Sequence, residues 1–312
     1  LNHKDMSSKE AVVFELHRPA RSRYPRRRTL LKGIDDLWQA DLMEMILYAR
    51  QNSGYKYILA VIDCFSKYAW VEPVKSKNAK DITQAMNNIF ISSGRVPKNI
   101  QTDNGKEFYN VSFKKLMEKH KINHYSTYSQ VKSSIVERFN RTFKSMMYQL
   151  FSLRGNYNYT KHLPDLINTY NNKLHRTIGM TPSEVNSGNE AILLANVYSS
   201  KVKRKDKQRF KEGDYVRVSK KRTIFSKGYT PNWSTEIFKI KNVRNTIPYT
   251  YLLEDLTGQP IQGAFYTQEL QKTKYKDVYL VEKILRRKKN KLYVKWLGFK
   301  KPSWINKNDL VE

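Results

Sequence analysis

The chain has 312 residues, 39% of them hydrophobic and 12% aromatic, which is enough for two or three domains with real cores. Lysine and arginine number 58 against 28 acidic residues, and the net charge of +30 indicates a polyanionic partner, either nucleic acid or an anionic membrane surface. No apolar run approaches the roughly 18–20 residues that a bilayer span needs, so we expect no membrane partner, and no secretory signal is visible.

A single cysteine, Cys64, excludes a disulfide within the chain and a zinc site of the two-His, two-Cys kind, so we expect no zinc. Cys64 lies in a strand-like apolar run, which favours a buried structural thiol in a reducing compartment. Because the sequence begins at Leu1 rather than Met, a fragment of a longer product is an open alternative.

The first segment, residues 1–36, is expected to be an extended basic arm. Six arginines fall between residues 18 and 28, and Pro19 and Pro25 interrupt any helix there. A solvated linker is one interpretation, and a DNA-contacting arm or a nuclear-import signal is the other. We expect the arm to contact DNA through three of these residues: Arg26, Arg27 and Arg28.

Residues 37–196 alternate between strand and helix patterns and predict an α/β domain with helices on both faces of a five-stranded mixed sheet. Strands are predicted at Leu37–Glu44, Tyr55–Asp63, Lys67–Val74, Lys98–Thr102 and Ile122–Tyr125. Helices are predicted at Ala79–Ser92, around Phe113–His120, from Ser134 onward and at His162–Leu174.

Three carboxylates in this domain point to phosphoryl transfer. Asp41 ends the run Leu37–Asp41, Asp103 follows the fourth strand, and Glu137 falls in the first turn of the long helix. Attack on a phosphodiester needs an activated oxygen nucleophile and a stabilised leaving oxygen, and two divalent ions held by carboxylates can provide both. We therefore predict that the three residues bind metal and are catalytic.

The same helix adds an amide and two cations to one stripe, because Asn140, Arg141 and Lys144 follow Glu137 at i+3, i+4 and i+7. Such a stripe suits a metal site flanked by a phosphate backbone. A surface helix with an ordinary Glu–Arg pair is the alternative that spacing alone leaves open. Asp63, by contrast, is expected to be a structural turn residue that accepts bonds from backbone amides.

The segments Trp38–Asp41, Thr102–Gly105 and Ile135–Thr142 resemble the three signature segments of the DDE integrase core, and Glu137 lies 34 positions after Asp103, close to the family spacing. The match is closest to integrases of Polinton/Maverick elements, which are akin to those of retroviruses and long-terminal-repeat retrotransposons. The resemblance covers about residues 10–312 and includes Tyr170–Asn172 and Thr181–Val185.

The resemblance implies an RNase H-like core that binds two Mg²⁺ or Mn²⁺ ions through Asp41, Asp103 and Glu137. It also implies a DNA integrase that trims 3′ ends and joins them to target DNA in the nucleus, assembled as a homo-oligomer on double-stranded DNA. The family's His-His-Cys-Cys zinc module is not recognisable, because His3 and His17 have no accompanying cysteine.

The last third is the most basic part, with 28 bases and 11 acids in residues 197–312. After a basic linker at 197–209, residues 210–274 carry short strand patterns and resemble the family's SH3-like barrel. Its basic face is expected to bind the DNA backbone without sequence preference. The residues expected to do so are Lys220, Lys221, Arg222 and Lys227.

Residues 277–312 resemble a chromodomain, with matching segments at Tyr279–Leu285, Tyr293–Phe299 and Ser303–Ile305. By position, Tyr279, Trp296 and Phe299 would form a cage for methyl-lysine, and the partner would be chromatin or a histone tail. A small hydrophobic core, a degenerate fold or a DNA contact are the alternatives, and Lys300 and Lys301 stand where chromodomains usually have acids.

Two rival functions remain at this point. One is a non-catalytic DNA- or chromatin-binding protein derived from an integrase, and the other is an RNase H-type nuclease on RNA–DNA hybrids. The complete acidic trio argues against the first rival, and the barrel that resembles an integrase argues against the second.

Overall fold

The chain forms two compact units in a computed structural model, one made of residues 29–201 and the other of residues 1–28 together with 202–312. We call them the core unit and the terminal unit. The structure describes residues 7–21, 23–27, 29–126, 134–198, 207–220, 229–299 and 301–310. Every helix within these ranges is too short or too polar to cross a bilayer.

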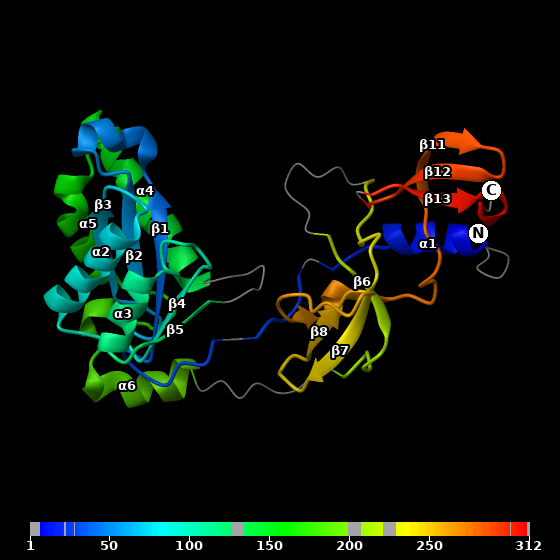
Figure 1. Cartoon of the computed structure of the whole chain (residues 1–312). Helices are drawn as coiled ribbons and strands as arrows, with labels where there is room; N and C mark the ends of the chain where they lie inside the picture. Colours follow the sequence, from blue (N-terminus) through cyan, green and yellow to red (C-terminus); the bar gives the residue numbers. More distant parts are fainter. Residues whose placement is uncertain are drawn as a thin grey trace. The chain divides into compact units, whose positions relative to one another are not determined.

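A five-stranded mixed sheet organises the core unit, as the sequence predicts (Figure 1). Its strand order is β3-β2-β1-β4-β5, in which β1, β2 and β3 are antiparallel neighbours while β4 and β5 continue parallel to β1. The strands are β1 (Leu37–Glu44), β2 (Tyr57–Asp63), β3 (Ala69–Val74), β4 (Asn99–Thr102) and β5 (Asn123–Ser126).

Helices cover both faces of this sheet. Alternate residues of a strand point to opposite faces, so Trp38, Ala40 and Leu59 pack under α2 and α3, while Met43, Ile58 and Ala60 pack under α4 and α5. The helices are α2 (Ala79–Ser93), α3 (Val111–Lys119), α4 (Ser134–Arg154), α5 (Leu163–Asn171) and α6 (Ser187–Leu193). The predicted α/β layering of residues 37–196 is therefore confirmed.

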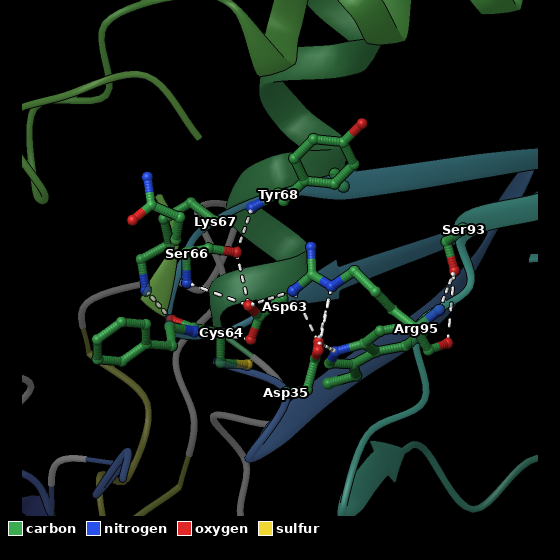
Figure 2. A network of polar contacts seen from close by, with 12 residues as sticks. Asp35, Asp63, Cys64, Ser66, Lys67, Tyr68, Ser93 and Arg95 are labelled. Carbon is green, nitrogen blue, oxygen red and sulfur yellow. Dashed lines mark hydrogen bonds and ion pairs between the residues drawn. The ribbon is translucent and has the colours of Figure 1, made fainter. Parts of the chain in front are cut away.

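A buried ionic network fixes the turn after β2 (Figure 2). The fully buried Asp63 carboxylate accepts bonds from the backbone N–H groups of Phe65 and Ser66, at 3.1 and 3.3 Å, and from Arg95 at 3.0 Å. The Arg95 guanidinium also contacts Asp35 at 2.7 Å. The prediction that Asp63 is a structural turn residue is confirmed.

The terminal unit contains two sheets. The first has the order β10-β6-β7-β8-β9 and the second the order β11-β12-β13. The strands are β6 (Tyr215–Val218), β7 (Phe238–Arg244), β8 (Thr250–Glu254), β9 (Phe265–Tyr266), β10 (Leu270–Lys272), β11 (Val281–Lys288), β12 (Lys291–Trp296) and β13 (Ser303–Asn306). The predicted strand-rich character of residues 210–312 is confirmed, while the SH3-like and chromodomain identities stay predictions.

The N-terminal segment differs from the expected extended arm, because Ser8–His17 forms a helix, α1. Ser7 caps it in a reciprocal capping box with Glu10. Val12 and Leu16, four residues apart on one face, are 2% exposed and pack with Trp233. Pro19 and Pro25 indicate an irregular chain only from residue 18 onward, so the expectation of an arm was wrong for the preceding ten residues.

Candidate active site

Strand register brings the first two predicted carboxylates side by side. β1 and β4 are parallel, with Gln39 opposite Gln101, and the two side-chain amides bond at 3.0 Å. Asp41 comes two residues after Gln39, and Asp103 comes two residues after Gln101. Because side chains alternate along a strand, both aspartates lie on the same face as these glutamines and at the same level of the two paired segments. Asp41 lies within β1, and Asp103 immediately follows β4.

Glu137 reaches this neighbourhood from the first turn of α4. The side-chain oxygen of Gln39 accepts hydrogen bonds from the backbone N–H groups of Ile135 and Val136, at 3.2 and 3.0 Å. These amides have no partner within the helix itself, so Gln39 ties the start of α4 to the strand that carries Asp41. Glu137 is exposed, and the side chain of Ser134, the predicted N-cap, lies outside the described residues.

An amide from α4 completes the contact with Asp41. The Nδ2 of Asn140 donates to Asp41 Oδ2 at 2.8 Å, and the backbone N–H of Leu42 donates to Asp41 Oδ1 at 2.9 Å. Burial raises the pKa of the Asp41 carboxyl, and the negative charges of Asp103 and Glu137 raise this pKa further. Asp103 and Glu137 are therefore close enough for their charges to act on Asp41.

The donor chemistry fits a divalent cation such as Mg²⁺, which prefers carboxylate, amide and water oxygens. The buried Oδ1 of Asn140 has no hydrogen-bond partner among the described residues, so an oxygen beside Asp41 is free to face a bound ion or its water. However, no three His, Cys, Asp or Glu side chains in the described ranges lie near enough to one another to ligate one ion. The assignment of the trio as metal ligands stays a prediction and requires the three carboxylates to draw together around the ion.

Lys144 adds a cation on the same face of α4, and its charge opposes the rise in the Asp41 pKa. Arg141, three residues before Lys144 on the same helix, is exposed. Both residues can therefore meet a DNA backbone beside the candidate site. Two residues of the helical stripe that the sequence predicts, Asn140 and Lys144, thus act on Asp41.

The other predicted DNA contacts belong to the terminal unit. The side chains of Arg26 and Arg27 are exposed. The backbone N–H of Arg27 donates to the hydroxyl of Tyr266, in β9, at 3.1 Å. Lys220 is also exposed. Four of the predicted residues lie outside the described part of the chain: Arg28, Lys221, Arg222 and Lys227.

The three aromatic residues of the predicted cage lie together in the terminal unit. The ring of Tyr279 meets Trp296 and Phe299 edge to face, with centroid separations of 5.9 and 5.8 Å. Tyr279 is 41% exposed, so the three rings do not form a closed hydrophobic core. The cage stays a prediction.

Gln39 is a functional residue that the sequence analysis missed. It is 2% exposed, and its side chain bonds both Gln101 and the start of α4. A glutamine two residues before a candidate catalytic aspartate, at a position that alternation places inside the domain, was the available signal. His124 instead packs against the Phe113 ring at 5.2 Å, as a packing histidine is expected to do.

Comparisons with known proteins found transposon-derived and integrase-like relatives. Residues 34–129 match the family model described as integrase core domain. A transposon-derived protein of Caenorhabditis elegans is 36% identical over 194 residues, which cover 62% of this chain and 65% of that protein. A Tf2 transposon polyprotein of Schizosaccharomyces pombe is 28% identical over 153 residues, covering 47% of this chain.

The chain spans just under two thirds of the worm relative's length and 11% of the yeast polyprotein. Among solved structures, a chain of the simian T-cell lymphotropic virus intasome in complex with PP2A regulatory subunit B56 gamma is similar, with a TM-score of 0.55 and 18% identity. This match covers 86% of the present chain and 92% of the viral one. At this identity the likeness establishes an integrase-type fold.

Proposed function

We propose that this protein is a DDE-type DNA integrase of a mobile element related to Polinton/Maverick elements, which trims 3′ ends and joins them to target DNA. The observation that carries the proposal is the pairing of Gln39 with Gln101, which sets Asp41 and Asp103 at one level of two neighbouring strands, together with the bond from Asn140, on the helix of Glu137, to Asp41. The match of residues 34–129 to the integrase core domain supports it.

The reaction proceeds as two single displacements at phosphorus. In each, an oxygen nucleophile forms a bond to phosphorus while the bond to the leaving 3′ oxygen breaks: water attacks in end trimming, and the freed 3′ hydroxyl attacks in strand transfer. Two Mg²⁺ or Mn²⁺ ions held by Asp41, Asp103 and Glu137 would supply charge neutralisation and activation of the nucleophile.

The chain's own residues bind and orient the reacting groups. Arg141 and Lys144 would hold the phosphate backbone beside the trio, since cations on one helix face suit a run of phosphates. Asn140 holds the Asp41 carboxylate, and Gln39 holds the first turn of α4, which carries Glu137, against the strand of Asp41.

Partners and location follow from this activity. Double-stranded DNA, as element ends and as target, is the proposed substrate, and the net charge of +30 matches it. Assembly as a homo-oligomer on DNA and action in the nucleus are part of the proposal. A chromatin or histone-tail partner would depend on three aromatic residues of the terminal unit, Tyr279, Trp296 and Phe299.

The test is strand transfer with a donor duplex whose 3′ end is already trimmed, a target plasmid and Mn²⁺. The wild type should form joined products, and Glu137→Gln should form none, because the change removes one charge from the reaction centre. Glu118→Gln is the matched control, since Glu118 is an exposed helix glutamate on α3, under the other face of the sheet. Equal product levels for the wild type and Glu137→Gln would favour the non-catalytic, integrase-derived DNA-binding protein.

A further inference from the structure

A cavity lies in the core unit, and none of Asp41, Asp103 and Glu137 lines it. It has a volume of about 250 Å³ and lies between α4, the turn after β2 and the segment that follows α5. Four of its lining residues are cations: Lys67, Arg138, Lys173 and Arg176. Its described lining includes no Asp or Glu, so the walls favour an anionic ligand.

The cations of this cavity are not neutralised by the fold. None of the four forms an ion pair with a carboxylate in the part of the chain that the structure describes. Lys67 is 6% exposed, and its ammonium group donates to the Cys64 carbonyl and lies 5.4 Å from the Tyr198 ring centroid. Because the charge of the buried Asp63 already acts on Lys67, the exposed cations Arg138, Lys173 and Arg176 are the groups left for an anion.

The cavity is not polar throughout. Ile62, Phe139 and Tyr170 line it, and the last two rings meet edge to face with centroids 4.8 Å apart. An isolated phosphate gains nothing from an apolar lining. A ligand with both an anionic group and a flat apolar part, such as a nucleotide, uses both kinds of wall.

α4 links this cavity to the acidic trio. Asn140, on one flank of its buried stripe, bonds Asp41, while Arg138 and Thr142 line the cavity on the other flank. Arg141 is exposed between the two flanks. A helix with its side chains is about 10–12 Å across, which a few nucleotides of a single strand can span.

We propose that the cavity lined by Lys67, Arg138, Tyr170, Lys173 and Arg176 seats one unpaired nucleotide of a DNA strand that continues from the acidic trio around α4. The phosphate lies at the rim, on Arg138, Lys173 and Arg176, and the base lies against the apolar wall. This inference rests on the proposed function, because it takes DNA as the substrate. A base pair is too large for the cavity, so the strand must be single there.

Binding of fluorescein-labelled DNA, followed by anisotropy in EDTA, tests the site without the reaction. The probes share one duplex and differ in having a blunt end, an unpaired 5′ or 3′ extension, or an internal gap. The wild type should bind at least one probe with unpaired nucleotides about fivefold or more tighter than the blunt duplex, since stacking one base contributes that much. Preference for an extension assigns the site to the donor end, and preference for the gap assigns it to the target.

Two variants place the preference in the cavity. Lys173→Ala/Arg176→Ala removes two rim cations, and Thr142→Trp fills the space from an exposed position of α4 without a change of charge. In each variant, the ratio of the affinity for the preferred probe to the affinity for the blunt duplex should fall close to one. Lys115→Ala/Lys119→Ala, a pair of lysines in the α3 segment under the other face of the sheet, should retain it. If the tryptophan variant fails to fold, the alanine pair alone decides.

The inference is overturned if the wild type binds all probes equally or if both cavity variants keep the preference. A competition with polyglutamate gives a further way to overturn it. If polyglutamate displaces the preferred DNA from the wild type but not from Lys173→Ala/Arg176→Ala, the cavity binds an acidic peptide instead. Glu137→Gln separates the two proposals when its DNA binding and its strand transfer are both measured. If it keeps the preference for unpaired nucleotides but transfers no strands, both proposals are supported. If it keeps the preference and strand transfer is undiminished, only the catalytic role of Glu137 is contradicted.

Discussion

The buried ion pair between Glu15 and Arg217 should hold α1 on the terminal unit, and Glu15→Ala removes it. The Arg217 side chain is 1% exposed, and its Nε lies 3.4 Å from Glu15 Oε2, which also accepts from the Thr273 hydroxyl at 2.8 Å. The change leaves a buried guanidinium whose remaining described acceptors are the carbonyls of Ser234 and Thr235, at 3.0 and 2.8 Å.

Breaking a buried pair by removing one partner costs about 3–5 kcal/mol. The two remaining carbonyls still accept from Arg217, so we place the cost near the lower end, at about 3 kcal/mol. A loss of that size corresponds to roughly a 100-fold faster hydrogen exchange for amides that are exposed only when the terminal unit opens.

Hydrogen exchange followed by mass spectrometry measures this locally, which matters because the chain has two units and need not unfold in one step. Exchange in β6 should accelerate, while exchange in β2 of the core unit should not change. Glu10→Ala, which breaks only the exposed capping box, should cost about 1 kcal/mol. The reasoning is refuted if β6 accelerates less than tenfold, or if Glu15→Ala/Arg217→Met is no better protected than Glu15→Ala, since the double change removes the uncompensated charge.

Three further predictions concern the candidate site and the aromatic group. Burial and the repulsion of nearby carboxylates raise the pKa of Asp41 in the folded, metal-free protein. The ionised carboxylate therefore destabilises the core unit at pH values above this raised pKa. The destabilisation disappears at pH values below the pKa that Asp41 has in the unfolded chain. Asp41→Asn should therefore raise the thermal midpoint in EDTA at pH 7, with the gain vanishing as the pH falls through the raised pKa; an unchanged gain at pH 3 would contradict this. Gln39→Leu should leave the α4 amides of Ile135 and Val136 without their acceptor, cost about 1–3 kcal/mol and speed their exchange, whereas Gln51→Leu, which removes an exposed bond to Tyr157, should not. Histone-tail peptides with and without lysine methylation should bind equally weakly by calorimetry, because Lys300 and Lys301 stand where chromodomains usually have acids; a tighter methylated peptide would establish the cage.

The core fold could be predicted because its signals are local. β1 is found at the predicted residues Leu37–Glu44, since apolar residues supply both of its faces, Trp38 and Ala40 on one and Leu37 and Met43 on the other, where Asp41 is half-buried. The convergence of Asp41 and Asp103 could be anticipated from carboxylate chemistry and from the family resemblance. Its physical cause, the pairing of Gln39 with Gln101 across parallel strands, depends on a register that no single segment specifies.

Long-range contacts account for what the sequence analysis missed. The capping box at Ser7 and Glu10 was visible in the sequence, but the partners of Glu15 lie more than 200 residues away, at Arg217 and Thr273. The cavity beside α4 joins a turn after β2 to a segment after α5, so its four cations come from three separate segments of the sequence.

The most direct measurement of the central claim is calorimetric titration of Mn²⁺ into the DNA-free protein and into Asp41→Asn, Asp103→Asn and Glu137→Gln. If the three carboxylates close around one reaction centre, each neutralisation should weaken Mn²⁺ binding, and Glu118→Gln should not change it. Equal Mn²⁺ binding by the wild type and all three neutralised variants would contradict the account.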